Sequence, residues 1–125
     1  MMNPNIPKTT VLYYINSSGE NPVKKFIETL LERQQRKLTR VLKYIEEYGL
    51  IAAIPHIKKL TGTSFWEIRI LGQDNIRVLY ASVYAKSILL LHGFVKKSKI
   101  TPRKEIEIAL NRLTDWINYQ KNLDK

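Results

Sequence analysis

The sequence predicts an α+β fold, in which a small antiparallel sheet packs against a helical hairpin and a C-terminal helix follows. The sheet is expected to contain an N-terminal strand and a three-strand meander. Two observations support this fold class. Between residues 64 and 97, three successive runs have the composition and alternation of half-buried strands. On both sides of this stretch, apolar residues recur at helical spacing. The length of 125 residues fits a single domain over residues 1–125.

The chain is strongly basic and contains no cysteine. It has 21 Lys and Arg residues against 11 Asp and Glu, a net charge of +10. Such an excess favours RNA, DNA, a ribosome, a membrane surface or an acidic protein as partner. The lack of cysteine excludes disulfides, thiolate zinc sites and a cysteine nucleophile, and it suits a cytoplasmic protein. No apolar run is long enough for a membrane span, so we expect no insertion into a membrane.

The N-terminal half begins with an expected loose arm at residues 1–8, which contain two prolines, and a β-rich strand at residues 9–15. Asn21 followed by Pro22 predicts a helix start, because Asn is a good N-cap and Pro suits the first helical position. Gly49 predicts the end of the helical region.

The apolar stripe of this helical region is interrupted at residues 32–37, ERQQRK. One unbroken helix would be about 42 Å long, which is long for a domain of this size. We therefore predict a helical hairpin with a tight turn near residues 33–35.

The strands at residues 64–71 and 75–83 can be placed in register by side-chain parity. In each strand one alternate set of residues is apolar, and the other set includes the charged residues. The apolar sets match only with an odd-numbered loop, for which LGQDN is the turn. The predicted pairs are Ile70 with Ile76, Ile68 with Val78, Trp66 with Tyr80, and Arg69 with Arg77.

This register predicts an anion site. Arg69 lies directly opposite Arg77, and like charges in this arrangement destabilise a sheet unless something neutralises them. A bound phosphate would do so; alternatively Glu67, one step along the strand, neutralises the pair and nothing binds. Trp66 and Tyr80 fall on the apolar face, where we expect core residues rather than base-stacking residues.

Residues 87–95 are expected to form the third strand. If its even positions continue the apolar face, Gly93 lies beside Arg77, where a missing side chain leaves room for a ligand. His92 then falls on the core face, so a buried, hydrogen-bonded histidine and a catalytic one both remain open. The predicted core residues of this strand are Ile88, Leu90 and Phe94.

Basic residues accompany both ends of the predicted sheet. A short strand at residues 57–61 carries two lysines, and a basic loop leaves the last strand. Thr101 and Pro102 then predict the start of the last helix. Residues 119–125 are expected to be frayed. The lysines in question are Lys58, Lys59, Lys96, Lys97 and Lys99.

The order of four segments resembles the RelE/HigB-type toxins of bacterial type II toxin–antitoxin systems. These belong to the RelE/ParE superfamily, and the chain looks most like its phage-derived branch. The segments are KKLTGTSFWEIRI at residues 58–70, IRVLY at 76–80, LLHGFVKKSKITP at 90–102 and IEIALNRL at 106–113.

The resemblance implies a cytoplasmic mRNA endoribonuclease (an mRNA interferase) that acts at the ribosome and inhibits translation without a metal or another cofactor. In such toxins the ribose 2′-OH attacks the adjacent phosphate, which leaves a cyclic phosphate and a 5′-OH. A cognate antitoxin, encoded next to the toxin and expected to carry a helix-turn-helix, is the implied protein partner.

Several residues of this chain match functional positions of these toxins. Arg77 matches the phosphate-contacting arginine of the middle strand, and Arg69 matches the basic position of the preceding strand. Lys96 and Lys97 match the basic pair after the last strand, and His92 is the candidate catalytic histidine. A lysine flanked by cations is expected to have a lowered pKa, as a general base requires. Further RNA contacts are expected from Lys58, Lys59, Glu67 and Lys99.

Two features leave other functions open. Glu67 stands where the best-studied toxins of this type have a basic residue, and residues 102–113 contain no tyrosine. The alternatives are a ParE-like inhibitor of a protein target such as DNA gyrase, and a catalytically inactive module that binds RNA or DNA.

Overall fold

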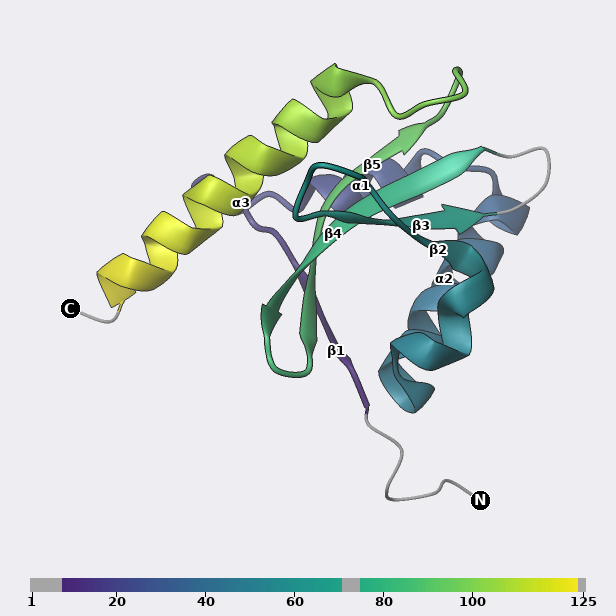
Figure 1. The fold of residues 1–125 in the computed structure, drawn as a ribbon, viewed down its shortest axis with the longest axis horizontal. Helices are drawn as coiled ribbons and strands as arrows, with labels where there is room; N and C mark the ends of the chain where they lie inside the picture. Colours follow the sequence, from purple (N-terminus) through teal and green to yellow (C-terminus); the bar gives the residue numbers. More distant parts are fainter. Residues whose placement is uncertain (1–7, 71–74, 124–125) are drawn as a thin grey trace.

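A five-stranded sheet with helices on both faces forms the protein (Figure 1), as described for residues 8–70 and 75–123 by a computed structural model. The predicted α+β class is therefore confirmed. Residues 1–7 of the predicted N-terminal arm and residues 71–74 of the predicted turn lie outside the described residues. The elements are β1 (Thr10–Tyr13), α1 (Pro22–Glu28), α2 (Glu32–Tyr48), the 3₁₀ helix η1 (Leu50–His56), β2 (Ile57–Lys59), β3 (Trp66–Ile70), β4 (Ile76–Tyr84), β5 (Ser87–Val95) and α3 (Arg103–Leu123).

The two faces of the sheet carry separate apolar cores. α1 and α2 pack on one face, and α3 crosses the other (Figure 1). The α1/α2 core includes Val23, Leu38 and Ile45, which are completely buried. The α3 core is smaller and includes Ala109, which is completely buried. Within the described residues, no helix is long and apolar enough to cross a membrane.

The predicted register of the central strands is confirmed. The strands lie in the order β1-β5-β4-β3-β2, and the pairs β2–β3, β3–β4 and β4–β5 are antiparallel. β3 and β4 pair Arg69 with Arg77, as the parity of the apolar residues required. The expected strand at residues 57–61 is present as the three-residue β2, in which Lys58 pairs with Glu67.

A β-bulge in β5 reverses the predicted parity of that strand. Tyr80 pairs with Leu90, whereas Leu79 pairs with His92, so Leu91 is an extra residue between the two pairs. Beyond the bulge, the side chain of His92 therefore lies on the α3 face. The prediction that His92 shares a face with the apolar residues Ile88 and Leu90 is wrong for this reason.

Phe94 and Gly93 are displaced by the same bulge. Phe94 now packs in the α3 core, and Gly93 pairs with Val78 on the α1 face. A Cβ at Gly93 would lie 2.8 Å from Cε2 of Phe26 in α1, and closer still to Cδ2. The missing side chain thus makes room for the Phe26 ring. The prediction that it leaves space for a ligand beside Arg77 is wrong.

The break between the two N-terminal helices lies at residues 29–31, not at residues 33–35 as predicted. The polar run that suggested the turn instead forms the first turn of α2. There, the side-chain oxygen of Gln34 accepts a hydrogen bond from the backbone N–H of Leu31 at 2.9 Å. The predicted outer boundaries are confirmed by Asn21, whose side chain caps α1, and by Gly49, which ends α2 with φ 80°.

Both ends of the chain also differ from the prediction. β1 pairs parallel with β5, so the sheet is mostly, not wholly, antiparallel. α3 continues to Leu123, although a frayed end was expected from residue 119. The Tyr84 ring packs edge-on against Trp116, and its hydroxyl donates a hydrogen bond to Gln120 at 3.1 Å. These contacts with β4 support the last turns of the helix.

Candidate functional site

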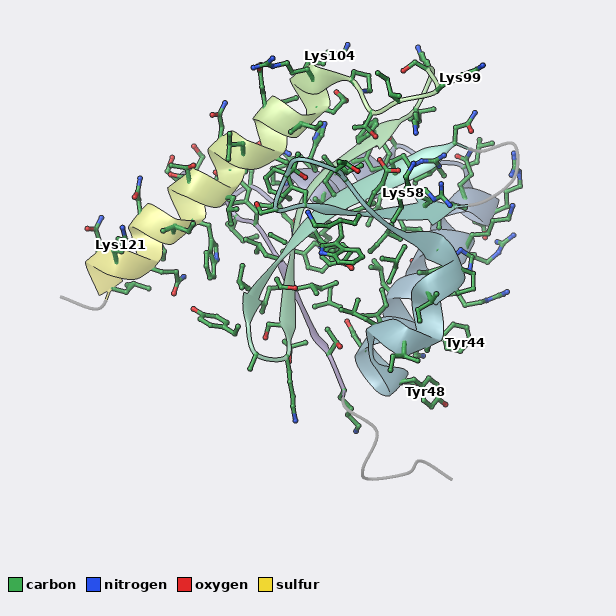
Figure 2. All side chains as sticks on the ribbon, in the orientation of Figure 1. Tyr44, Tyr48, Lys58, Lys99, Lys104 and Lys121 are labelled. Carbon is green, nitrogen blue, oxygen red and sulfur yellow. The ribbon has the colours of Figure 1, made fainter. Side chains whose placement is uncertain are left out.

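Charged side chains from three segments surround one hollow on the α3 side of the sheet. The hollow has a volume of about 230 Å³, and it lies between β2, β3 and the loop that leads into α3. Figure 2 shows Lys58 over the sheet and Lys99 at the tip of that loop. The charged and hydroxyl side chains that line the hollow include Lys58, Lys59, Glu67, Lys96, Lys99 and Thr101.

Glu67 is the only carboxylate among the residues that line this described hollow, and its side chain is 0% exposed. Its Oε2 accepts a hydrogen bond from the Thr101 hydroxyl at 2.6 Å. Its Oε1 lies 3.3 Å from Nε of Arg77, but without the alignment of a hydrogen bond. Glu67 therefore neutralises part of the arginine pair, as the alternative reading of the sequence proposed.

The two arginines retain unused hydrogen-bonding capacity. The side chain of Arg77 is 11% exposed, and one of its terminal nitrogens donates to the carbonyl of Ile76 at 3.0 Å. Within the described part of the chain, Nε of Arg77 and Nε of Arg69 are both buried without a hydrogen-bond partner. Buried donors are almost always satisfied. Oε1 of Glu67, 3.3 Å from Nε of Arg77, is likewise without a hydrogen-bond partner, so the charged groups around the arginine pair are only partly satisfied by one another.

Lys96 lies within the same electrostatic cluster. Burial lowers the pKa of its ammonium group below the ordinary 10.5, and the charges of Arg77, Lys58 and Arg69 lower it further. Glu67 acts in the opposite direction and raises this pKa. The direction of the shift is the one expected for a lysine flanked by cations, although burial is its largest cause, and it favours the neutral amine that a proton acceptor requires.

His92 lies under α3 with both ring nitrogens engaged. Nδ1 is 3.3 Å from Arg112, which can only donate, so Nε2 carries the hydrogen that points to Glu105 at 3.4 Å. Burial lowers the pKa of His92, Glu105 opposes this shift, and Arg112 adds to it. The ring also stacks on Phe94, with centroids 5.5 Å apart. The structure thus favours the buried, hydrogen-bonded histidine.

The remaining predicted residues are distributed around the hollow or away from it. Lys97 is exposed and does not line it. Lys59 reaches its rim, but its ammonium donates to the carbonyl of Thr63 in the following turn. Tyr80 is buried as predicted, whereas Trp66 is 37% exposed, so the expectation of a core position for Trp66 is wrong.

The sequence reasoning missed the role of Thr101. It was expected to cap α3, but α3 begins at Arg103 and the Thr101 hydroxyl bonds to Glu67 instead. The two residues are 34 positions apart, so no local pattern connects them. The available signal was Glu67 itself, because a carboxylate in a buried strand requires donors from elsewhere.

Residues 25–114 match the family described as phage-derived protein Gp49-like (DUF891). The chain belongs to this family. The Gp49-like family is associated with RelE-like toxins. The matched region extends from α1 into α3 and contains every charged residue of the hollow. A search of curated proteins found no match to the chain.

Over residues 8–70 and 75–123, no group of three or more His, Cys, Asp or Glu residues is arranged to hold a metal ion. The chemistry of the hollow is that of guanidinium, ammonium, carboxylate and hydroxyl groups.

Proposed function

We propose that this Gp49-like protein is the toxin of a type II toxin–antitoxin pair and a metal-independent endoribonuclease. It would cleave mRNA at the ribosome, in the cytoplasm, and so inhibit translation. One observation supports this most directly: the paired Arg69 and Arg77 have buried Nε donors without a hydrogen-bond partner, and Glu67, 3.3 Å from Arg77, lines a hollow whose other charged residues are lysines. A phosphodiester offers acceptor oxygens for both donors, and guanidinium groups match its geometry.

The proposed reaction uses lysines of the hollow and the arginine pair next to Glu67. Arg69 and Arg77 hold the scissile phosphate and stabilise the charge of its pentacoordinate transition state. Neutral Lys96 accepts the proton of the ribose 2′-OH, whose oxygen attacks phosphorus. The bond to the 5′ oxygen breaks, which leaves a 2′,3′-cyclic phosphate, and protonated Lys99 donates a proton to the leaving oxygen. Lys58, Lys59 and Lys97 would contact neighbouring phosphates.

Lys96→Met is the sharpest test, because it removes the proton acceptor and retains most of the aliphatic side chain. Arg77→Ala is less suitable, since it would leave the buried Glu67 without its counter-ion. We expect Lys96→Met to reduce cleavage of ribosome-bound mRNA by a factor on the order of 100 or more. The matched control is Lys104→Met in the exposed first turn of α3, which should cleave like the unmodified chain.

The pH dependence gives a second readout. Cleavage by the unmodified chain should rise with pH as Lys96 loses its proton, and should level off below the ordinary lysine pKa of 10.5. Lys96→Met should lack this rise. Unchanged cleavage and an unchanged pH profile in a folded Lys96→Met protein would show that the assigned base is wrong.

A second candidate function is RNA binding without cleavage. The observation that favours it is the 3.3 Å approach of Glu67 to Arg77, which supplies an anion from within the chain. In that case the protein would bind RNA with a steep dependence on salt, and the RNA would remain intact. Mapping of 5′ ends after incubation with ribosome-bound mRNA distinguishes the two functions.

The proposed partner is an antitoxin with a helix-turn-helix, encoded beside this chain. We expect it to be acidic, because negative charge would complement the net charge of +10 of this chain. Co-expression with the product of the neighbouring reading frame should restore growth to cells that express this chain.

A further inference from the structure

Exposed apolar side chains of the described residues gather on the face of the sheet opposite the candidate site, where η1 meets β3 and β4. The side chains of Ile51 and Ile54 in η1 are 78% and 61% exposed, and Trp66 in β3 is 37% exposed. All three line one hollow of about 250 Å³, whose remaining walls are formed by Leu50, Ile57, Tyr80 and Ser82. Single exposed hydrophobic residues are ordinary, but a group that lines one concavity is not.

A second hollow of about 250 Å³ adjoins the first and shares Leu50, Ile51 and Ser82 with it. It extends between the end of α2 and the β4–β5 turn; Figure 2 shows Tyr48, one of its lining residues, at the end of α2. The two hollows therefore adjoin at these three residues, and together they are here called the η1 groove.

The charges along the η1 groove have one sign. Lys8 and Lys86 line the second hollow, and among the described residues no carboxylate lines either one. Each hollow is also smaller than the roughly 300–1,000 Å³ of typical small-molecule sites. The dimensions therefore suit individual apolar side chains of a larger partner, and the lysines suit negative charge beside them.

We propose that the η1 groove binds an acidic, amphipathic helix of a partner protein, with one apolar side chain in each hollow and carboxylates against Lys8 and Lys86. Helix-in-groove recognition has this form: apolar anchors on one helical face enter a groove, and charges at its rim select the partner. A second copy of this chain is a poor occupant, because it would bring the same lysines and its own net charge of +10. The groove and the hollow around Glu67 lie on opposite faces, so this inference does not depend on nuclease activity.

The test uses a synthetic helical peptide of about five turns, with leucine on one face and glutamate on the other. Isothermal titration calorimetry should show binding to the full chain with a micromolar Kd. Ile54→Glu should weaken binding by about tenfold or more, since it places a charge in the apolar groove. Leu31→Glu is the matched control: Leu31 is 60% exposed against 61% for Ile54, it lies at the α1–α2 connection, and the charge change is identical.

Three outcomes would overturn the proposal. One is equal weakening by Ile54→Glu and Leu31→Glu, which would indicate a general charge effect. Another is equal binding of a peptide in which lysine replaces every glutamate, which would show that Lys8 and Lys86 do not favour an acidic partner. The third is self-association of the chain in sedimentation that Ile54→Glu abolishes, which would assign the groove to a second copy. Selective loss with Ile54→Glu, together with no binding of the lysine peptide, supports it.

Discussion

Replacement of Glu67 by glutamine tests whether this carboxylate occupies the place of a ligand anion. Glutamine has nearly the same shape, and its side-chain oxygen can still accept the hydrogen bond that Thr101 donates to Glu67 at 2.6 Å. What disappears is the negative charge 3.3 Å from Nε of Arg77. Glu67→Gln therefore leaves Arg77 near Arg69 and Lys96 without the negative charge of this carboxylate.

The expected loss of stability follows from the burial of the pair. The side chains of Arg77 and Glu67 are 11% and 0% exposed, so solvent screens their interaction little. Removal of one partner of a buried ion pair costs about 3–5 kcal/mol. The separation of 3.3 Å exceeds that of a short charge-assisted hydrogen bond, which favours the lower end. We expect the free energy of unfolding to fall by about 3 kcal/mol, or Tm by roughly 10 °C.

Inorganic phosphate should reverse part of this loss. A ligand that binds only the folded state adds stability of about 2.7 kcal/mol when its concentration is 100 times its Kd. Phosphate should therefore stabilise Glu67→Gln more than it stabilises the unmodified chain, because the variant lacks the internal anion. The assay is denaturant unfolding in phosphate and in chloride at equal ionic strength.

Glu107→Gln provides a control with nearly the same geometry. Glu107 lies 3.2 Å from Arg103, but these side chains are 60% and 90% exposed, and a surface pair contributes about 0–1 kcal/mol. Equal stability of Glu67→Gln and Glu107→Gln would refute the assigned importance of the buried pair. If phosphate stabilised Glu67→Gln no more than chloride does, the arginines would not form an anion site.

Two further predictions concern the bulged strand β5. Gly93→Ala should lower the free energy of unfolding by about 1–3 kcal/mol, because the added methyl group overpacks against Phe26. Phe26→Leu in the same chain should recover part of this stability. Unimpaired stability together with weaker RNA binding would instead indicate that Gly93 contacts a ligand. For His92, the folded-state pKa lies below the ordinary 6.5, so its contribution to stability is complete above about pH 6.5 and is lost as pH falls toward the lower folded value. His92→Gln should remove this part of the pH dependence in denaturant titrations, and an unchanged slope would show that another group is responsible.

The alternation of side chains in the sequence was enough to predict much of the candidate site. In β3 and β4, only one set of alternate residues is suited to the main core, and a shift by one residue would bury the other set. The opposition of Arg69 and Arg77 follows from that constraint, and so does the position of Glu67 on the same face. The capping of α1 by Asn21 and the end of α2 at Gly49 were likewise readable, because these preferences depend on nearby backbone atoms.

The positions of His92 and Gly93 could not be read in this way. Residues 88–91, Ile-Leu-Leu-Leu, are apolar at both parities, so they contain no alternation that could reveal a bulge. The bulge arises from how β5 meets β4, and Arg112 of α3 stabilises it by donating to the Leu91 carbonyl at 2.8 Å. Packing of three elements thus decides which face His92 occupies.

The sequence by itself determined the fold class, the strongly positive charge and the facing arginines, because each depends on composition or on a short-range period. Only the tertiary structure decided that Thr101 completes the environment of Glu67, that Gly93 accommodates Phe26, and that Trp66 remains partly exposed. These features depend on contacts between residues far apart in the chain. Their energies arise from burial and close packing, which no local spacing of residues encodes.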